Sequence, residues 1–225
     1  MNQSADGTRR APLSRERVLR AAVAFADGAG TDAISMRKLA QELGVVPMAL
    51  YKHVANKDEL LDGMVDLVVG EIGPPGAGEW RLTMRAHILA ARRVLLRHPW
   101  AAGVIQSRTS PTPAVLGHLD SMARLFRTGG FSVALTHHAM HAMGSRLLGF
   151  SQELFDDTAA DPDPALLQQL ARAYPHIAEL AGAVGHDAAS TVGNCDDQAE
   201  FEFALDLLLD GLDRLRAAEG LGHGT

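Results

Sequence analysis

Residues 44–61, GVVPMALYKHVANKDELL, place several groups that can contact phosphate close together in the chain. These groups are Tyr51, Lys52, His53 and Lys57. They belong to a basic part of the chain, because residues 1–57 carry nine Lys and Arg against five Asp and Glu. Residues 58–225 carry twelve against twenty-two. A basic head on an acidic body indicates that the head meets a polyanion, and a chance imbalance of surface charge is the alternative.

The histidine cluster in LTHHAMHAMGS is a second group of residues that could bind a ligand or a metal ion. His137 and His141 lie one helical turn apart and could share a metal ion, but a metal site needs a third or fourth ligand. His118 and Glu153 are the only distant candidates, so we expect pocket or interface histidines and no metal or cofactor. No nucleophile with a paired base and no HExxH motif appears, so we do not expect an enzyme.

The composition predicts an all-α protein. Hydrophobic residues make up 47% of the chain and aromatic residues only 5%, and runs rich in β-branched residues are few. Cys195 is the only cysteine and residues 1–12 lack the apolar core of a signal peptide, which favours the cytoplasm. No segment has the uninterrupted apolar length of a membrane span.

Capping residues and breakers predict the helices of the first part. Ser14 precedes a helix that ends near Gly28, and Ser35 caps a second helix over 36–43. Pro47 begins a third, with Leu50 and Val54 facing inward, and Asn56 caps a fourth that runs toward Ile72.

The segment GPPGAGEW, residues 73–80, is the strongest linker signal. Beyond it we expect helices over 80–97, 100–106, 113–127, 132–155, 166–173 and 197–216, with a loop over 156–164 and a mobile segment over 182–196. The expected organisation is a disordered tail (1–12), a first domain with its linker helix (13–72), a second domain (80–217) and a disordered tail (218–225).

The last predicted helix has an unusually wide apolar surface. Its acidic residues form one narrow stripe, made of Glu202, Asp206, Asp210 and Asp213. Such a helix needs neighbours on more than one side, which favours a subunit interface over the core helix of a monomer.

Residues 36–62, MRKLAQELGVVPMALYKHVANKDELLD, resemble the DNA-binding region of the tetracycline-repressor (TetR) family. The match includes RKLA, LGV, LY, HV, NK and LLD in unbroken register. A weaker resemblance covers residues 14–216. It implies an N-terminal three-helix helix-turn-helix DNA-binding domain plus a C-terminal helical ligand-binding and dimerisation domain. A homodimeric regulator, usually a repressor, is implied, with the helices over 132–155 and 197–216 pairing as a four-helix bundle.

The resemblance assigns the DNA contacts. Arg37, Tyr51, His53 and Lys57 match positions that hold the DNA backbone. For Tyr51 a core position is the alternative, and for His53 packing beneath the recognition helix.

At the base-reading positions the chain departs from the tetracycline repressor, whose glutamine, threonine and tryptophan fall on Pro47, Ala49 and Lys52. Val46, Pro47, Met48 and Ala49 offer contacts to thymine methyl groups, and Lys52 offers the main polar contact. DNA shape is expected to supply much of the remaining specificity.

The family's drug and magnesium positions fall on Gly73, His87, Ala91, Ile105 and Met122, so two ligand histidines of the tetracycline repressor are missing. We therefore expect an apolar pocket for a small hydrophobic effector. Its expected lining is His87, Ile105, Arg108, Leu119, Met122, His137, Met140 and Gly144. An activator of the same family, or a metal-dependent helical-bundle protein using His137 and His141, are the alternatives.

Overall fold

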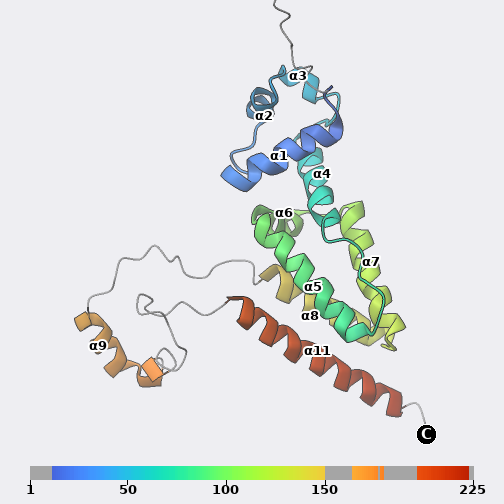
Figure 1. Cartoon of the computed structure of the whole chain (residues 1–225), viewed down its shortest axis with the longest axis vertical. Coiled ribbons are helices and arrows are strands. Elements are labelled where there is room, and N and C mark those ends of the chain that lie inside the picture. The colour runs from blue at the N-terminus through green and yellow to red at the C-terminus, as the bar shows by residue number, and fades with distance from the viewer. Residues whose placement is uncertain (1–11, 150–163, 177, 180–196, 223–225) are drawn as a thin grey trace, which may run out of the picture. The chain divides into compact units, whose positions relative to one another are not determined.

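The computed structural model describes residues 12–149, 164–176, 178–179 and 197–222 (Figure 1). Within these ranges every regular element is a helix, which confirms the predicted all-α class. The chain divides into two compact units. The first comprises residues 1–77 and 86–124, and the second comprises residues 78–85 and 125–225.

The first unit begins with four helices whose starts follow from local capping. They are α1 (Arg15–Ala29), α2 (Met36–Leu43), α3 (Pro47–Leu50) and α4 (Lys57–Gly70). Ser14 Oγ accepts a hydrogen bond from the Arg17 N–H and Ser35 Oγ from the Lys38 N–H, each at 3.2 Å. Asn56 Oδ1 accepts from the Glu59 N–H at 2.8 Å. These contacts satisfy N–H groups that the first turn of a helix leaves without partners, and they confirm the predicted caps.

The core of the first unit forms where α4 crosses α1. α1 packs against α2 and α4, α2 packs against α3, and α4 also packs against α6 (Trp100–Ser107). Leu60, Met64 and Val68 of α4 are fully buried. At Gly63 a Cβ atom would lie 2.7 Å from Leu19 Cδ2, so a larger residue there would force the Leu19 side chain to move.

A polar cluster around the buried His98 and Trp100 joins the end of α1 to the corner between α5 (Trp80–Arg97) and α6. Asp27 Oδ1 accepts a hydrogen bond from Trp100 Nε1 at 2.8 Å and lies 2.8 Å from His98 Nδ1. Glu71, which follows α4, binds Arg97 at 2.5 Å and lies 3.5 Å from His98 Nε2. Buried polar groups are tolerated when they find such partners.

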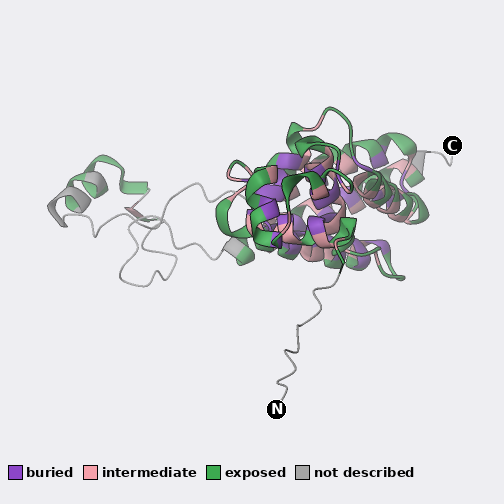
Figure 2. Ribbon diagram, turned by 90° about the horizontal axis from the view of Figure 1, so that it is seen from above, coloured by how far each residue is buried: buried purple, intermediate pink, exposed green. Residues whose placement is uncertain are grey.

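The second unit is built on an aromatic cluster. It contains the first residues of α5, the end of α7 (Pro113–Thr128), α8 (Val133–Gly149) and α11 (Asp197–Gly222). α8 packs against α11. Trp80 and Phe126 both contact Phe131, with ring centroids 4.7 and 5.0 Å apart, and all three rings are buried. Figure 2 shows helices that carry both buried (purple) and exposed (green) residues.

The acidic stripe of α11 faces arginines of α5. Arg85 donates to Asp206 and to Glu202, each at 2.7 Å. Arg81 pairs with Asp210. The hydrogen bond to Arg85 is the main reason why the pKa of the Asp206 carboxyl lies below its usual value. The stripe therefore docks α11 onto its own unit, while other α11 positions face outward.

The described ends of the helices differ from the expectation by more than one residue at three places. α11 continues to Gly222, past the predicted end at Arg216 and into the predicted tail, because Ala217, Ala218 and Glu219 favour a helix and Glu219 accepts from Ser132 Oγ at 2.8 Å. α4 ends at Gly70, and α9 (Pro164–Ala173) begins at its proline.

Several predicted features lie outside the described residues. They are the tail over 1–11, the helix extension over 150–155, the loop over 156–163, the whole segment 182–196 with Cys195, and residues 223–225. Among the described helices, none has the length and apolar character needed to span a bilayer.

The contact at Gly129 gives a prediction for stability. A Cβ atom there would lie 2.8 Å from Cβ and Cγ of the buried Trp80. We expect Gly129→Ala to lower the free energy of unfolding by about 1–3 kcal/mol, because overpacking forces the aromatic cluster apart. Gly28→Ala, where an added Cβ meets nothing within 4 Å, is the control and should not destabilise. Urea unfolding of both variants tests this, and equal stability of Gly129→Ala and wild type would contradict the packing argument.

Candidate DNA-binding surface and ligand pocket

The short helix α3 is held in place from its buried side. Pro47 occupies the first helical position, where its missing N–H costs nothing. Leu50 and Val54 are buried, as predicted, and the Val54 N–H donates to the Leu50 carbonyl at 3.0 Å. α3 is a single turn, and the chain continues as a turn over 51–53 before Asn56 starts α4. The helix is thus anchored by two side chains while its other faces stay free.

The exposed surface of α3 is apolar. Val46 is 68% exposed and Met48 is 71% exposed, while Pro47 is exposed and Ala49 half-buried. At this exposure their own unit covers only about a third of each of these two residues. Such a surface can contact apolar groups of a ligand or partner, but it offers few hydrogen bonds.

Basic and aromatic residues surround this surface. Arg37 at the start of α2 and Lys52 after α3 are exposed, and Tyr51 is 47% exposed, which disfavours the core alternative for its ring. His53 is half-buried. Lys57 Nζ donates to the Thr31 carbonyl at 3.2 Å, so this lysine also ties α4 to the loop before α2.

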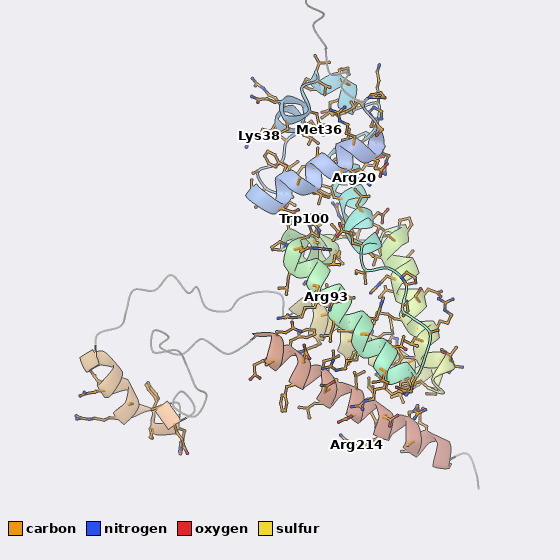
Figure 3. All side chains as sticks on the ribbon, in the orientation of Figure 1. Arg20, Met36, Lys38, Arg93, Trp100 and Arg214 are labelled. Carbon is orange, nitrogen blue, oxygen red and sulfur yellow. The ribbon has the colours of Figure 1, made fainter. Side chains whose placement is uncertain are left out.

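Lys38 of α2 extends away from the ribbon in Figure 3 and donates to the Ala33 carbonyl at 3.2 Å. It fixes the same loop as Lys57. The sequence-based assignments omitted Lys38, although its exposed position on α2 is readable from the helical pattern. The first unit thus gathers the predicted head residues around α2, α3 and the start of α4.

The residues expected to bind a ligand fall in both units. In the first unit His87 and Met122 are buried, Ile105 is half-buried and Leu119 is 40% exposed. In the second unit His137 of α8 is exposed, whereas Met140 and Gly144 are half-buried.

Arg108 contacts acidic groups of α4. Its Nη1 lies 3.0 Å from Asp58 Oδ1, and its Nε lies 3.0 Å from Asp62 Oδ1. Arg108 directly follows the last residue of α6, so its guanidinium links α6 to the first turns of α4. A ligand contact by Arg108 stays a prediction, and any such ligand would compete with two carboxylates.

A pocket of about 290 Å³ lies in the first unit between the end of α4 and α7. Its lining is Val69, Gly70, Gly73, Pro74, Ala114, Gly117, His118 and Ser121. Ring centroids of His118 and the buried His87 lie 4.8 Å apart in a stacked arrangement. Burial, with a contribution from His118, lowers the pKa of His87 to about 4, and burial lowers the pKa of His118 too. The pair is therefore uncharged at neutral pH.

The sequence analysis missed His118 as a lining residue. The available signal was its position on α7, one helical turn before Met122, which shares that side of the helix. The resemblance identifies Gly73 only as a drug or magnesium position of the family, and in the structure this glycine lines the pocket.

The histidines of α8 contact one another at the surface. The rings of His137 and His141 have centroids 4.6 Å apart, and both residues are exposed. In the part of the chain that the structure describes, no group of three or more His, Cys, Asp or Glu side chains is placed to hold a metal ion. Glu153 lies outside that part.

Comparisons with known proteins cover both units. Residues 18–64 match the family described as "Bacterial regulatory proteins, tetR family", and residues 72–216 match "Tetracyclin repressor-like, C-terminal domain". The HTH-type transcriptional repressor DrrR1 of Streptomyces coeruleorubidus is 31% identical over 213 residues, which cover 91% of this chain and 79% of that protein.

Two similar solved structures contain bound partners. ActR of Streptomyces coelicolor in complex with actinorhodin is 28% identical with a TM-score of 0.69, covering 92% of this chain and 99% of that one. BioQ with its double-stranded DNA operator is 25% identical with a TM-score of 0.61, covering 89% of this chain and 98% of that one.

The buried His87 predicts a pH dependence of stability. Its pKa of about 4 lies below the ordinary value of 6.5, so the unfolded chain binds the proton more tightly than the folded chain. The stability that depends on an uncharged His87 is therefore fully present above pH 6.5 and is lost as the pH falls toward 4. Between pH 7 and pH 5 wild type should lose about 2 kcal/mol through this group, and His87→Leu should lack that loss. Urea unfolding at both pH values tests this, and an equal loss in both proteins would exclude a buried neutral His87.

Proposed function

The chain belongs to the tetR family of bacterial regulatory proteins, and from this premise we propose which of its residues act in a ligand-responsive, DNA-binding transcriptional regulator. The observation that carries the assignment is the exposed turn of α3, flanked by the basic residues of α2 and α4. Proteins of this kind act through binding, so the proposal contains no catalytic step.

Arg37, Tyr51, His53 and Lys57 are proposed to hold the DNA backbone. Contacts to phosphates position a protein on a duplex without reading its sequence. Exposed Arg37 and Tyr51 are free to reach phosphates, and Lys57 stands at the first position of α4, where backbone N–H groups also attract anions. His53 is half-buried, so the accessible part of its ring is proposed to add a phosphate contact beside Tyr51.

Val46, Pro47, Met48 and Ala49 are proposed to contact base edges in the major groove. With 68% of Val46 and 71% of Met48 exposed, these side chains fit thymine methyl groups better than polar base edges. Lys52 adds the main polar contact, to guanine or phosphate. This surface lacks the polar readers of the tetracycline repressor, so we propose a different operator.

α11 and α8 are proposed to form the interface of a homodimer. Phe203, Leu207 and Leu215 of α11 are 63%, 54% and 55% exposed, on sides of the helix that its own unit does not cover. Exposed apolar rows of this kind mark interaction surfaces. Two-fold symmetry would place two α3 helices about 34–36 Å apart, which fits a palindromic operator.

A small hydrophobic effector is proposed to release the DNA by shifting a conformational equilibrium. The pocket beside His118 includes Val69 and Gly70 at the end of α4, and Lys57 begins the same helix. A ligand that favours one position of α4 therefore changes the position of the DNA-binding surface. The ligand complex of ActR supports this reading, and the name of DrrR1 favours repression over activation. We propose a cytoplasmic location, because operator binding requires access to the chromosome.

The role of Lys52 predicts a change in operator affinity. DNA selected by the purified protein from a random pool should contain a palindrome. We expect Lys52→Ala to weaken binding to that DNA about tenfold and, if the contact is to phosphate, to reduce the salt slope by about 0.9. Arg93→Ala removes an exposed charge on α5 and serves as the control. Unchanged affinity and unchanged salt slope in Lys52→Ala would refute the assignment, and absence of any DNA binding at low salt would refute the function.

The proposed dimer interface predicts an effect of charge on assembly. We expect Leu207→Asp to produce monomers in light scattering at micromolar concentration and to weaken operator binding at least tenfold, since a charge cannot be buried there without a partner. Leu116→Asp on α7, a site that is 53% exposed, is the matched control. A dimeric Leu207→Asp protein would show that α11 does not form the interface.

A further inference from the structure

His87 carries a polar atom that lacks a partner. The residue is 4% exposed, and its Nε2 atom is buried without a hydrogen bond among the described residues. Buried polar atoms in folded proteins are nearly always satisfied, so each exception needs an explanation. A ligand that supplies the missing hydrogen bond is one explanation, provided that a path to the atom exists.

His118 provides that path. It lines the 290 Å³ pocket and its ring stacks on the ring of His87, with an interplanar angle of 27°. His118 is only half-buried, and side chains at such positions change rotamer readily. Rotation of its ring away from His87 would connect the unpartnered nitrogen with the pocket.

The pocket wall is open to an apolar molecule. Gly70, Gly73 and Gly117 contribute backbone only, and a Cβ atom added at any of them would meet nothing within 4 Å. Val69, Pro74 and other apolar groups form most of the remaining wall. The space therefore suits a mainly apolar body, with the histidine pair and Ser121 as the polar end.

We propose that the effector is an uncharged, mainly apolar molecule with a hydroxyl group, which enters beside His118 and hydrogen-bonds to His87 Nε2. This inference rests on the proposed function. A hydroxyl group both donates and accepts, so it satisfies Nε2 in either tautomer of a neutral imidazole. A carboxylate can only accept and an ammonium can only donate.

The charge of the pair opposes ionic ligands. Because burial keeps both rings neutral at pH 7, no cation in the pair offsets the cost of moving a carboxylate into an apolar space. A bound carboxylate could accept one hydrogen bond from the tautomer that carries its proton on Nε2, but no positive charge would balance its own charge. A neutral hydroxyl group avoids this cost.

Three matched probes test the ligand class: 1-naphthol, naphthalene and 1-naphthoate. Their binding to the full chain is measured at pH 7 by calorimetry without DNA, so the result does not depend on operator binding. We expect 1-naphthol to bind about five- to tenfold more tightly than naphthalene, as one neutral hydrogen bond allows. We expect 1-naphthoate to bind more weakly than 1-naphthol.

Variants locate the preference. His87→Leu should bind 1-naphthol and naphthalene equally, and His87→Gln should recover part of the preference, which a purely structural role would not do. Gly117→Val should weaken all three probes by filling the pocket, with thermal unfolding as the check that each variant is folded.

A preference for 1-naphthoate, a preference for 1-naphthol that persists in His87→Leu, or no binding of any probe to wild type would overturn the proposal. Because the probes are measured without DNA, none of these results would bear on the proposal that the protein binds an operator. If wild-type protein without any probe failed to bind DNA, that result would instead overturn the proposed function.

Discussion

The packing of α4 is the constraint on which the first unit depends. Leu60, Met64 and Val68 are fully buried, and Gly63 allows close contact with Leu19 of α1. The same helix begins beside the turn that we propose to face DNA and ends in the wall of the pocket. A packed helix moves as a body, because its core contacts do not deform continuously. One element therefore joins the two proposed activities of this unit.

The local features of the fold could be predicted from the sequence because their causes lie within a few residues. Ser14, Ser35 and Asn56 bind N–H groups three residues ahead, and Pro47 has a backbone angle that suits a first helical position. The basic head could be predicted for the same reason, because α2, α3 and the start of α4 form one short segment. Its buried anchor Leu50 and its exposed neighbours follow from position alone.

Contacts between distant segments could not be predicted in this way. The sequence gives no sign that Arg108 faces Asp58 and Asp62, fifty residues away in the first case. The stack of His87 on His118 depends on how α5 and α7 pack, which is a property of the whole unit. The acidic stripe of α11 was visible as a pattern, but its arginine partners on α5 were not. Sequence reasoning therefore described the local structure of α2, α3 and the start of α4 better than the packing around the pocket.

The exposed Val46 and Met48 have a thermodynamic consequence. A reading surface built from apolar side chains releases ordered water when it covers thymine methyl groups, and this burial gives binding a negative heat capacity change. The enthalpy of operator binding would then become more favourable with rising temperature while the entropy becomes less so. The free energy stays nearly constant where the two changes compensate. A helix that reads bases without polar side chains would in this way keep a nearly constant affinity for its operator over the range of temperatures at which a cell grows.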